Sequence, residues 1–362
     1  MPVTTSKPKY VQLADQLRER IHSGELQVGD RLPSYAEMYR DYGATTATMQ
    51  RVCELLEQEN LIERRSGSGI YVAELLWSAR KQTNTIGLLI HSYYWGDKNA
   101  TPFIPSQAML AGIREACRES HKEVLLLDDN DAVHSSKADG IIIYSDKLEA
   151  YSLGISTEVP QVLIGQQADD IASVKIDDFS GGKLATTHLI RRGHQRIACF
   201  MEGVFDETLQ RIAGYRAALH QAHIDENERW IRRTPKANLS ASFSYLEWGR
   251  LQMRKWLKED WRQLNCTAIV AQNDQAAIGV MQILQEEGIK IPEEVSVVGF
   301  DGTKVCDLVQ PRLTSIQVPY YQMGCEAVKV LLSQMENPVQ QTTPATITLP
   351  VKLREGRSVL EI

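Results

Sequence analysis

Beyond residue 84 the sequence repeats one pattern several times: a short apolar run is followed by a longer segment with apolar residues on one helical face. Such alternation is typical of parallel β-sheets covered by helices, because parallel strands need long crossover connections. Strands are predicted at 85–91, 123–128, 140–144, 161–165, 196–201, 268–272 and 295–300, and helices at 107–120, 181–192, 210–222, 243–258, 275–287 and 321–335. We therefore expect an α/β fold with parallel sheets over this part of the chain.

Residues that directly follow these strands are the first candidates for a ligand site, because ligands of parallel sheets bind outside the carboxyl ends of the strands. Carboxylates and amides beside aromatic rings suit a polyhydroxylated ligand, since hydroxyl groups need acceptors and the C–H faces of a sugar stack on rings. Taken one at a time, each such residue also fits a helix cap or a turn. The candidates at or just after the strand ends are Tyr93, Trp95, Tyr144, Gln166, Asn273, Asp274 and Asp301.

The first 72 residues carry a different pattern, in which short helices precede a hairpin. Apolar spacing predicts a helix over 10–22, a capping box predicts a second helix from Ser34, and Thr45 is the expected cap of a third. A tight turn between the second and third helices makes a helix-turn-helix, whose later helix can enter a major groove. Alternating residues around a glycine-containing turn over 61–72 predict a two-stranded wing.

The third helix is the expected recognition helix, and its exposed face would present Thr45, Thr46, Thr48, Gln50 and Arg51. Glutamine pairs well with adenine, and arginine with guanine or phosphate. The net charge of the chain is −6, so bulk charge gives no support for DNA binding. The prediction of DNA binding therefore depends on where the basic residues lie in the N-terminal part of the chain.

Composition excludes several other classes of protein. The longest apolar runs have the length of strands, and the N-terminus carries no apolar secretory signal, so we expect a cytoplasmic protein without a membrane segment. The six cysteines are widely spaced and include no C-x-x-C pair, which argues against a zinc site and a disulfide framework. We expect no metal and no cofactor.

The order of motifs in residues 10–72 resembles the GntR family of bacterial regulators. The shared motifs are Y-x-Q-L, L-R-x-x-I-x-x-G-x-L, G-D-R-L-P-S, L-x-x-x-x-L-I-x-R and G-x-G-x-Y-V. This resemblance implies that the motif arginine and the wing glycines approach DNA. The family usually has arginine at the positions of Thr46 and Gln50, so a different operator preference is expected. The DNA-binding set is completed by Arg31, Ser34, Arg65, Gly67, Ser68 and Gly69.

Residues 85–350 are similar to the LacI/GalR type of sensor domain, which is related to periplasmic sugar-binding proteins. The similarity is carried by 178–197, 211–215, 273–279, 295–301 and 313–316. It implies that Arg211, Asn273 or Asp274, and Asp301 contact an effector from one lobe, while the loops at Tyr93 and Tyr144 line the other. Only about eleven residues separate the strands at 123–128 and 140–144, too few for the usual helix, so the first lobe is expected to be abbreviated there.

These interpretations divide the chain into three parts. A winged helix-turn-helix is expected at 1–73, a linker at 74–84, and a two-lobed periplasmic-binding-protein-like sensor at 85–362. Lobe one is expected to contain 85–175 and 316–338, and lobe two 176–315 and 339–362.

The combination resembles the arabinose-repressor type of regulator. It implies a repressor that binds a double-stranded DNA operator as a homodimer. A sugar or related small molecule would close the lobes and alter the separation of the paired DNA-binding domains.

Two alternatives stay open at this point. A parallel sheet with acids at its strand ends also hosts hydrolases and kinases, but the sequence has no G-x-S-x-G, P-loop or H-E-x-x-H motif, so we do not expect an enzyme. The second alternative is a small-molecule sensor whose N-terminal helices mediate protein contacts.

Overall fold

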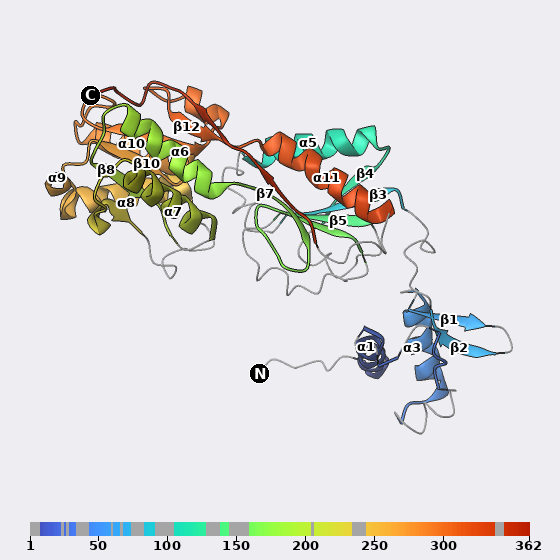
Figure 1. The fold of residues 1–362 in the computed structure, drawn as a ribbon. Coiled ribbons are helices and arrows are strands. Elements are labelled where there is room, and N and C mark those ends of the chain that lie inside the picture. Colours follow the sequence, from blue (N-terminus) through green and yellow to red (C-terminus); the bar gives the residue numbers. More distant parts are fainter. Residues whose placement is uncertain are drawn as a thin grey trace. The chain divides into compact units, whose positions relative to one another are not determined.

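The computed structural model describes residues 8–22, 25–26, 29–33, 43–58, 61–65, 68–73, 83–90, 105–127, 138–144, 159–203, 206–233, 244–336 and 344–362. The chain divides into two compact units (Figure 1). The first contains residues 1–83, and the second is built from 84–156 and 160–362. The expected linker lies mostly outside the described residues, as do the expected second helix from Ser34 and the segment 128–137 that was expected to be abbreviated.

In its described residues, the N-terminal unit packs two helices against a hairpin. Its elements are α1 (Lys9–His22), α3 (Thr46–Gln58), β1 (Ile62–Arg65) and β2 (Gly69–Val72), with the two strands antiparallel. One apolar face of each helix is buried in a shared core, which includes Leu17 of α1 and Met49 of α3. The backbone N–H of Thr48 donates to Thr45 Oγ1 at 3.3 Å, so the predicted cap of α3 is confirmed.

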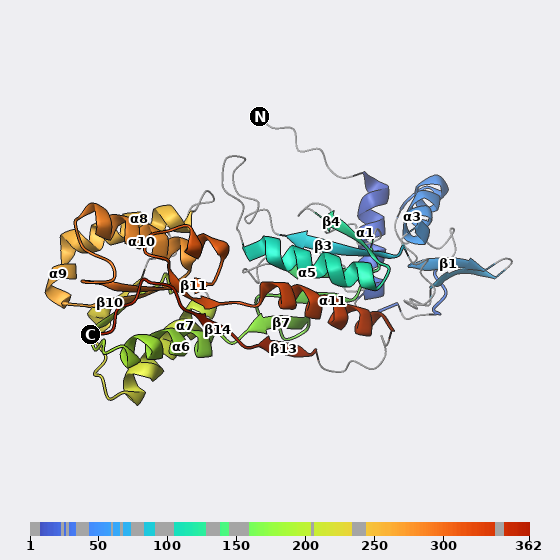
Figure 2. The same cartoon turned by 90° about the horizontal axis from the view of Figure 1, so that it is seen from above.

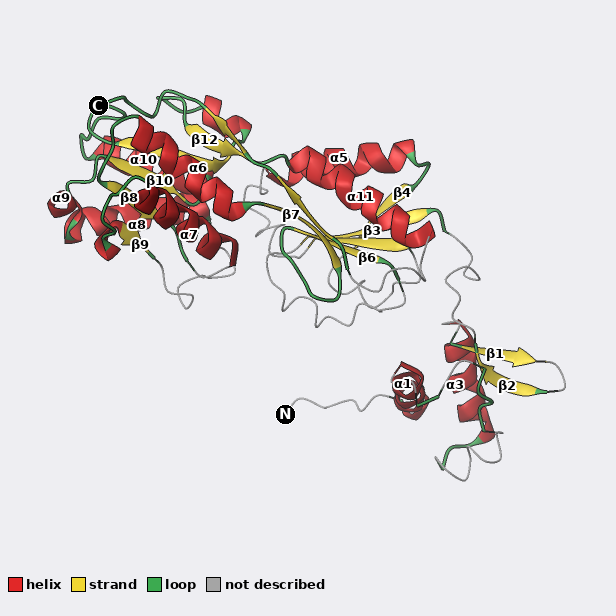
Figure 3. Ribbon diagram, in the orientation of Figure 1, coloured by secondary structure: helices red, strands yellow, loops and turns green. Residues whose placement is uncertain are grey.

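The second unit contains two six-stranded sheets (Figure 3). The first sheet is wholly parallel, with the strand order β13-β7-β6-β5-β3-β4. Its strands are β3 (Thr85–Ile90), β4 (Glu123–Leu127), β5 (Gly140–Tyr144), β6 (Gln161–Ile164), β7 (Ala172–Ile176) and β13 (Thr346–Leu349). We call this sheet, with the helices α5 (Pro105–Glu119) and α11 (Tyr320–Glu336) that pack on it, the first lobe.

The second sheet has the order β14-β12-β11-β10-β8-β9 and is parallel except for β14, which runs antiparallel to β12. Its strands are β8 (Ile197–Phe200), β9 (Ile231–Arg232), β10 (Ala268–Ala271), β11 (Ser296–Asp301), β12 (Thr314–Gln317) and β14 (Lys352–Arg354). Its helices are α6 (Asp178–Arg191), α7 (Asp206–Gln221), α8 (Tyr245–Glu259), α9 (Trp261–Leu264) and α10 (Asp274–Glu286), and short 3-10 helices lie at Glu228–Trp230 and Lys304–Asp307. We call these elements the second lobe. The predicted α/β fold with parallel sheets is confirmed.

Successive side chains of β8 point to opposite faces of the second sheet, and helices cover both faces. Ile197 and Cys199 belong to the core beneath α6 and α7, whereas Ala198 and Phe200 belong to the core beneath α8 and α10. Burial on both faces explains why this strand reads as a continuous apolar run in the sequence.

The chain passes between the two sheets three times in the described residues (Figure 2): from β7 to α6, from β12 to α11, and from β13 to β14. The sequence interpretation placed all of 339–362 in lobe two, but β13 pairs with β7 of the first sheet. Residues 346–349 therefore belong to the first lobe. Their alternating pattern of threonine and aliphatic residues fits an edge strand.

Helices α5 and α11 lie side by side on the first sheet (Figures 1 and 2) and approach each other closely. A Cβ atom at Gly112 of α5 would lie 2.0 Å from the carbonyl oxygen of Tyr321, and one at Gly324 of α11 would lie 2.3 Å from the carbonyl oxygen of Met109. Glycine at these two positions lets the backbones of the two helices pack directly against each other.

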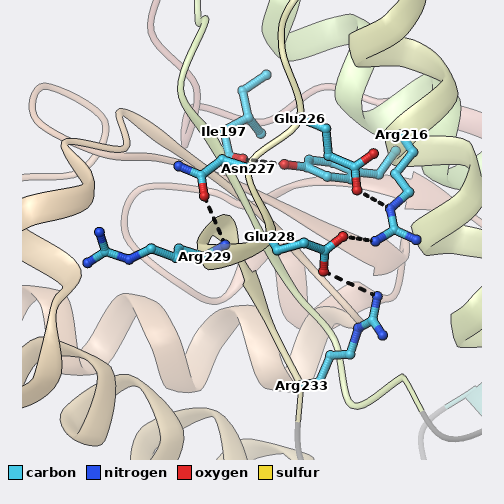
Figure 4. A network of polar contacts seen from close by, with 8 residues as sticks. Ile197, Arg216, Glu226, Asn227, Glu228, Arg229 and Arg233 are labelled. Carbon is cyan, nitrogen blue, oxygen red and sulfur yellow. Dashed lines mark hydrogen bonds and ion pairs between the residues drawn. The ribbon is translucent and has the colours of Figure 1, made fainter.

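On the second lobe, α7 is fastened by buried and exposed contacts (Figure 4). The buried Tyr215 hydroxyl donates to the Ile197 carbonyl oxygen at 2.7 Å. At the surface, Arg216 pairs with Glu226 and Glu228. Because exposed ion pairs add at most about 1 kcal/mol, the buried tyrosine contributes more to the position of α7.

Candidate DNA-binding and effector sites

The N-terminal end of α3 presents the predicted recognition residues. Thr45, Thr46, Gln50 and Arg51 are exposed. Thr48 is half-buried, and its hydroxyl lies 2.9 Å from that of Thr45. The opposite face of the helix enters the core through Met49 and Val52. The helix therefore offers hydroxyl, amide and guanidinium groups to a groove while its other side anchors it.

Four predicted DNA-binding residues lie on or beside the hairpin of β1 and β2: Arg31, Arg65, Ser68 and Gly69. Residues 29–32 run beside β2, where Leu32 N–H donates to the Ile70 carbonyl at 2.8 Å and Arg31 bridges with Tyr71. A Cβ at Gly69 would lie 2.9 Å from Arg31 Nε, so a glycine here, with φ of +130°, leaves room for the guanidinium. Predicted residues Ser34 and Gly67 lie outside the described residues.

Tyr71 organises the remaining wing contacts, although it was not among the predicted DNA-binding residues. The guanidinium of Arg65 lies 4.5 Å from the centre of its ring, and the hydroxyl of Ser68 lies 2.6 Å from its hydroxyl. The sequence motif could have identified this residue, because Tyr71 is the tyrosine of the G-x-G-x-Y-V motif.

Arg211 of α7 is the centre of the candidate effector site. It is 8% exposed, and its Nε donates to Asp178 Oδ1 at 2.8 Å while its Nη1 donates to the Gln272 carbonyl oxygen at 2.7 Å. The guanidinium carbon lies 3.6 Å from the ring centre of Phe300. Burial opposes its charge, but Asp178 and Asp301 outweigh that effect and raise the pKa of Arg211.

Asp301, at the end of β11, is buried and conformationally strained. Its φ of +108° is unfavourable for any residue with a side chain, and such strain concentrates at functional sites. Its Oδ1 accepts a hydrogen bond from the Tyr320 hydroxyl at 2.7 Å. Burial and the neighbouring Asp274 raise the pKa of Asp301 to about 8.

Asn273 and Asp274 stabilise the backbone around the start of α10 through side-chain hydrogen bonds. The side chain of Asn273 accepts from the Ala276 N–H at 2.8 Å and so caps the helix. Asp274 accepts from the N–H and hydroxyl of Thr303, each at 2.7 Å, and from the Ser315 hydroxyl at 2.5 Å. These bonds fix the loop that follows Asp301, which makes Asp274 a support for that residue.

Two further predicted residues lie at strand ends of the first lobe. Tyr144 ends β5, is 8% exposed, and is near enough to Tyr320 to raise the pKa of that tyrosine. Gln166 follows β6 and lines a pocket of about 100 Å³ together with Asp178, Glu207 and Gln210. Tyr93 and Trp95 lie outside the described residues.

The structure thus places Arg211 near Asp301, brings Gln166 to a pocket that also contains Asp178, and gives Asn273 and Asp274 supporting contacts. Sequence reasoning did not select Asp178 or Tyr320. Asp178 is the first letter of the D-x-x-G-G motif. Tyr320 follows β12, a strand the sequence pattern did not predict, so the strand-end rule was never applied to it.

Among the described residues no cluster of three or more histidine, cysteine or acidic side chains could hold a metal ion. In the same part of the chain, no helix combines the length and the apolar character needed to cross a membrane.

Two family models match separate parts of the chain. Residues 9–72 match the bacterial regulatory proteins of the gntR family, and residues 186–359 match the periplasmic binding protein-like domain. The two matches fall in the two different structural units.

Some relatives match most of the chain and others match about half of it. The arabinose metabolism transcriptional repressor of Geobacillus stearothermophilus is 27% identical over 354 residues, which cover 91% of this chain and 92% of that protein. The HTH-type transcriptional repressor PurR of Vibrio atlanticus is 32% identical over 208 residues, covering 56% of this chain and 59% of that repressor.

Solved structures share the fold. The complex of the transcriptional regulator CelR with cellobiose has a TM-score of 0.65 at 21% identity and covers 90% of this chain and all of that one. A LacI family regulator from Enterococcus faecium with bound ribose has a TM-score of 0.63 at 25% identity and covers 77% of this chain and 99% of that one. The chain is a ligand-responsive transcriptional regulator that joins a GntR-family domain at residues 9–72 to a periplasmic-binding-protein-like domain at residues 186–359.

Proposed function

We propose that the chain is a cytoplasmic, homodimeric repressor that releases its operator DNA when an uncharged sugar binds near Asp301 and Arg211. One observation carries this proposal: a buried, strained carboxylate is held beside an arginine whose charge is already paired with Asp178. Paired acceptors next to a fixed donor suit the hydroxyl groups of a sugar. The Arg211 guanidinium is already paired with Asp178, which disfavours a phosphorylated ligand that would need this cation.

The relatives guide the choice of sugar. Because one of them is named for arabinose metabolism, and structures similar to this one contain cellobiose and ribose, L-arabinose, ribose and cellobiose are the first compounds to test. A thermal-shift screen should include the matching sugar phosphates. A sugar at 100 times its Kd stabilises the fold by about 2.7 kcal/mol, which is readily measured. A shift with a sugar phosphate alone would contradict the proposal of an uncharged ligand.

The N-terminal unit supports the DNA-binding part of the proposal. Arg31 beside the wing and Arg51 on α3 are exposed cations on the two elements that a winged helix-turn-helix presents to DNA. We expect Arg31→Ala and Arg51→Ala each to weaken binding to the chain's own upstream DNA. If an arginine contacts phosphate, its loss also reduces the steepness of the plot of the logarithm of the DNA-binding constant against the logarithm of the salt concentration, by about one. Arg118→Ala, an exposed arginine of α5, is the matched control.

Unchanged DNA affinity in both variants would favour the alternative in which the N-terminal helices mediate protein contacts. We propose no catalytic step for the chain, and the relatives named above are regulators. Dimer formation is checked by analytical ultracentrifugation with and without DNA. The expected complex contains two chains per operator.

A further inference from the structure

A side-chain hydrogen bond joins the candidate effector site to the first lobe. Asp301 ends β11 of the second sheet, whereas Tyr320 begins α11, which packs on the first sheet. The Tyr320 hydroxyl donates to Asp301 Oδ1 at 2.7 Å, and the Val318 N–H donates to the Asp301 carbonyl oxygen at 3.1 Å just before the helix begins. The carboxylate is therefore tied to both lobes.

Both ends of this contact are firmly held. On the Asp301 side, the Gly302 N–H donates to Ser315 Oγ at 3.1 Å, and Asp274 binds Thr303, so the backbone after the carboxylate is fixed. On the Tyr320 side, α11 is locked to α5 where the backbone of Tyr321 lies against Gly112. These contacts hold the backbone next to each residue within its own lobe.

We propose that Tyr320 is a positioning residue of the effector site, which fixes the carboxylate of Asp301 and makes effector binding depend on where α11 lies. This proposal rests on the proposed function, in which Asp301 receives the sugar. A carboxylate has two oxygens, so Tyr320 holds Oδ1 and leaves Oδ2 for a hydroxyl of the effector. Because binding couplings are reciprocal, an occupied site must in turn favour one placement of the α5–α11 pair.

The charged groups that face Asp301 give this contact a measurable signature. Arg211 of α7 and the Tyr320 hydroxyl favour the carboxylate, whereas burial, Asp274 of α10 and Asp178 of α6 raise its pKa. Loss of the Tyr320 hydroxyl removes one stabilising donor, so the pKa of Asp301 should rise further. A residue that only fills space would leave that pKa unchanged.

The test compares Tyr320→Phe with Tyr321→Phe, its exposed neighbour on the same helix. The affinities for L-arabinose, ribose and cellobiose are measured by calorimetry from pH 6 to pH 9.5, and ligand-free thermal stability is measured over the same range. We expect Tyr320→Phe to weaken effector binding by about 10- to 100-fold, the loss typical of a hydrogen bond to a charged group. The pH at which Asp301 titrates should also rise, and Tyr321→Phe should match the wild type.

Equal effector affinity and equal pH profiles in the two variants would overturn the proposal. An Asp301→Asn background supplies the second control, because there Tyr320→Phe should no longer alter the pH profile of ligand-free stability. If the wild type binds no sugar, the proposed function fails. The ligand-free pH profiles still decide whether Tyr320 sets the titration of Asp301.

Discussion

Asp301 combines three features that are costly for stability: a positive φ, deep burial, and proximity to Asp274. Proteins keep such residues where a ligand needs them, and replacement often stabilises the ligand-free fold. The burial of this carboxyl also makes stability depend on pH. Because its pKa rises from 3.8 to about 8 on folding, the folded state holds a proton that the unfolded state has lost. Its contribution therefore favours folding at low pH and is lost as the pH rises from about 4 to about 8.

Asp301→Asn removes this titration while keeping the shape of the side chain. We expect the ligand-free variant to be more stable than the wild type at pH 8, by about 0.5–2 kcal/mol, and the difference to shrink as the pH falls toward 5. The same variant should lose the thermal shift caused by the sugar. Thermal unfolding at several pH values checks both outcomes. The exposed Asp170→Asn is the control, and equal pH profiles for the two variants would contradict the prediction.

Arginines 211 and 216 lie on the same helix but in opposite environments. Arg211 is buried with Asp178, whereas the ion pairs of Arg216 are at the surface (Figure 4). Arg211→Ala leaves a buried carboxylate without its partner and should destabilise the protein by about 3–5 kcal/mol. Arg216→Ala should cost about 1 kcal/mol or less. Chemical denaturation measures both, and similar losses would mean that the Asp178–Arg211 pair is not the anchor described above.

At the scale of elements, the packing of α5 on α11 depends on two positions without side chains. Gly112→Ala places a methyl group 2.0 Å from the Tyr321 carbonyl oxygen, so the helices must move apart. We expect a loss of stability of about 1–3 kcal/mol and a weaker response to the effector, because the start of α11 moves with the helix. Arg114→Ala, exposed on α5, is the control. Wild-type stability in Gly112→Ala would show that the two helices tolerate a wider separation.

Local patterns predicted the central strands and the long helices of the second unit, because each depends on neighbouring residues, but missed the strands β7, β9, β12, β13 and β14. The predicted strand at 140–144 matches β5, and the Thr45 cap is present. By contrast, β7 was not predicted, since Ser173 and Lys175 interrupt its apolar run. Helix α7 begins at Asp206 rather than at residue 210, because polar residues fill its first turn.

The contacts of the candidate site were harder to predict than its residues. Arg211 and Asp301 were selected from motifs, yet their partners Asp178 and Tyr320 come from other elements, separated from them by 33 and 19 positions. Which side chains meet depends on the crossings between the two sheets. Periodicity along the sequence carries no information on those crossings, and the assignment of 346–349 to the wrong lobe has the same cause.

At the scale of the whole molecule, the binding sites of the two units must be energetically coupled if a sugar is to control DNA binding. The predicted DNA-binding residues lie in the unit of residues 1–83, and the candidate effector site lies in the other unit. A regulator of this kind requires that sugar and operator favour different states of the protein. The coupling has a thermodynamic consequence that does not depend on its structural route. If the sugar weakens operator binding by some factor, the operator must weaken sugar binding by the same factor.

We therefore expect the Kd of the sugar to increase by about 5- to 150-fold when the protein is saturated with operator DNA, and the Kd of the operator to increase equally when sugar is saturating. Titration calorimetry gives the first ratio and fluorescence anisotropy the second, both at one fixed salt concentration because DNA affinity is strongly salt-dependent. Non-specific DNA of equal length serves as the control for the charge of the nucleic acid. If the sugar Kd is the same with and without operator, the sugar is bound but does not act as the inducer. If both ratios are large and equal in the wild type but fall toward one in Tyr320→Phe, the contact between α11 and Asp301 carries the coupling.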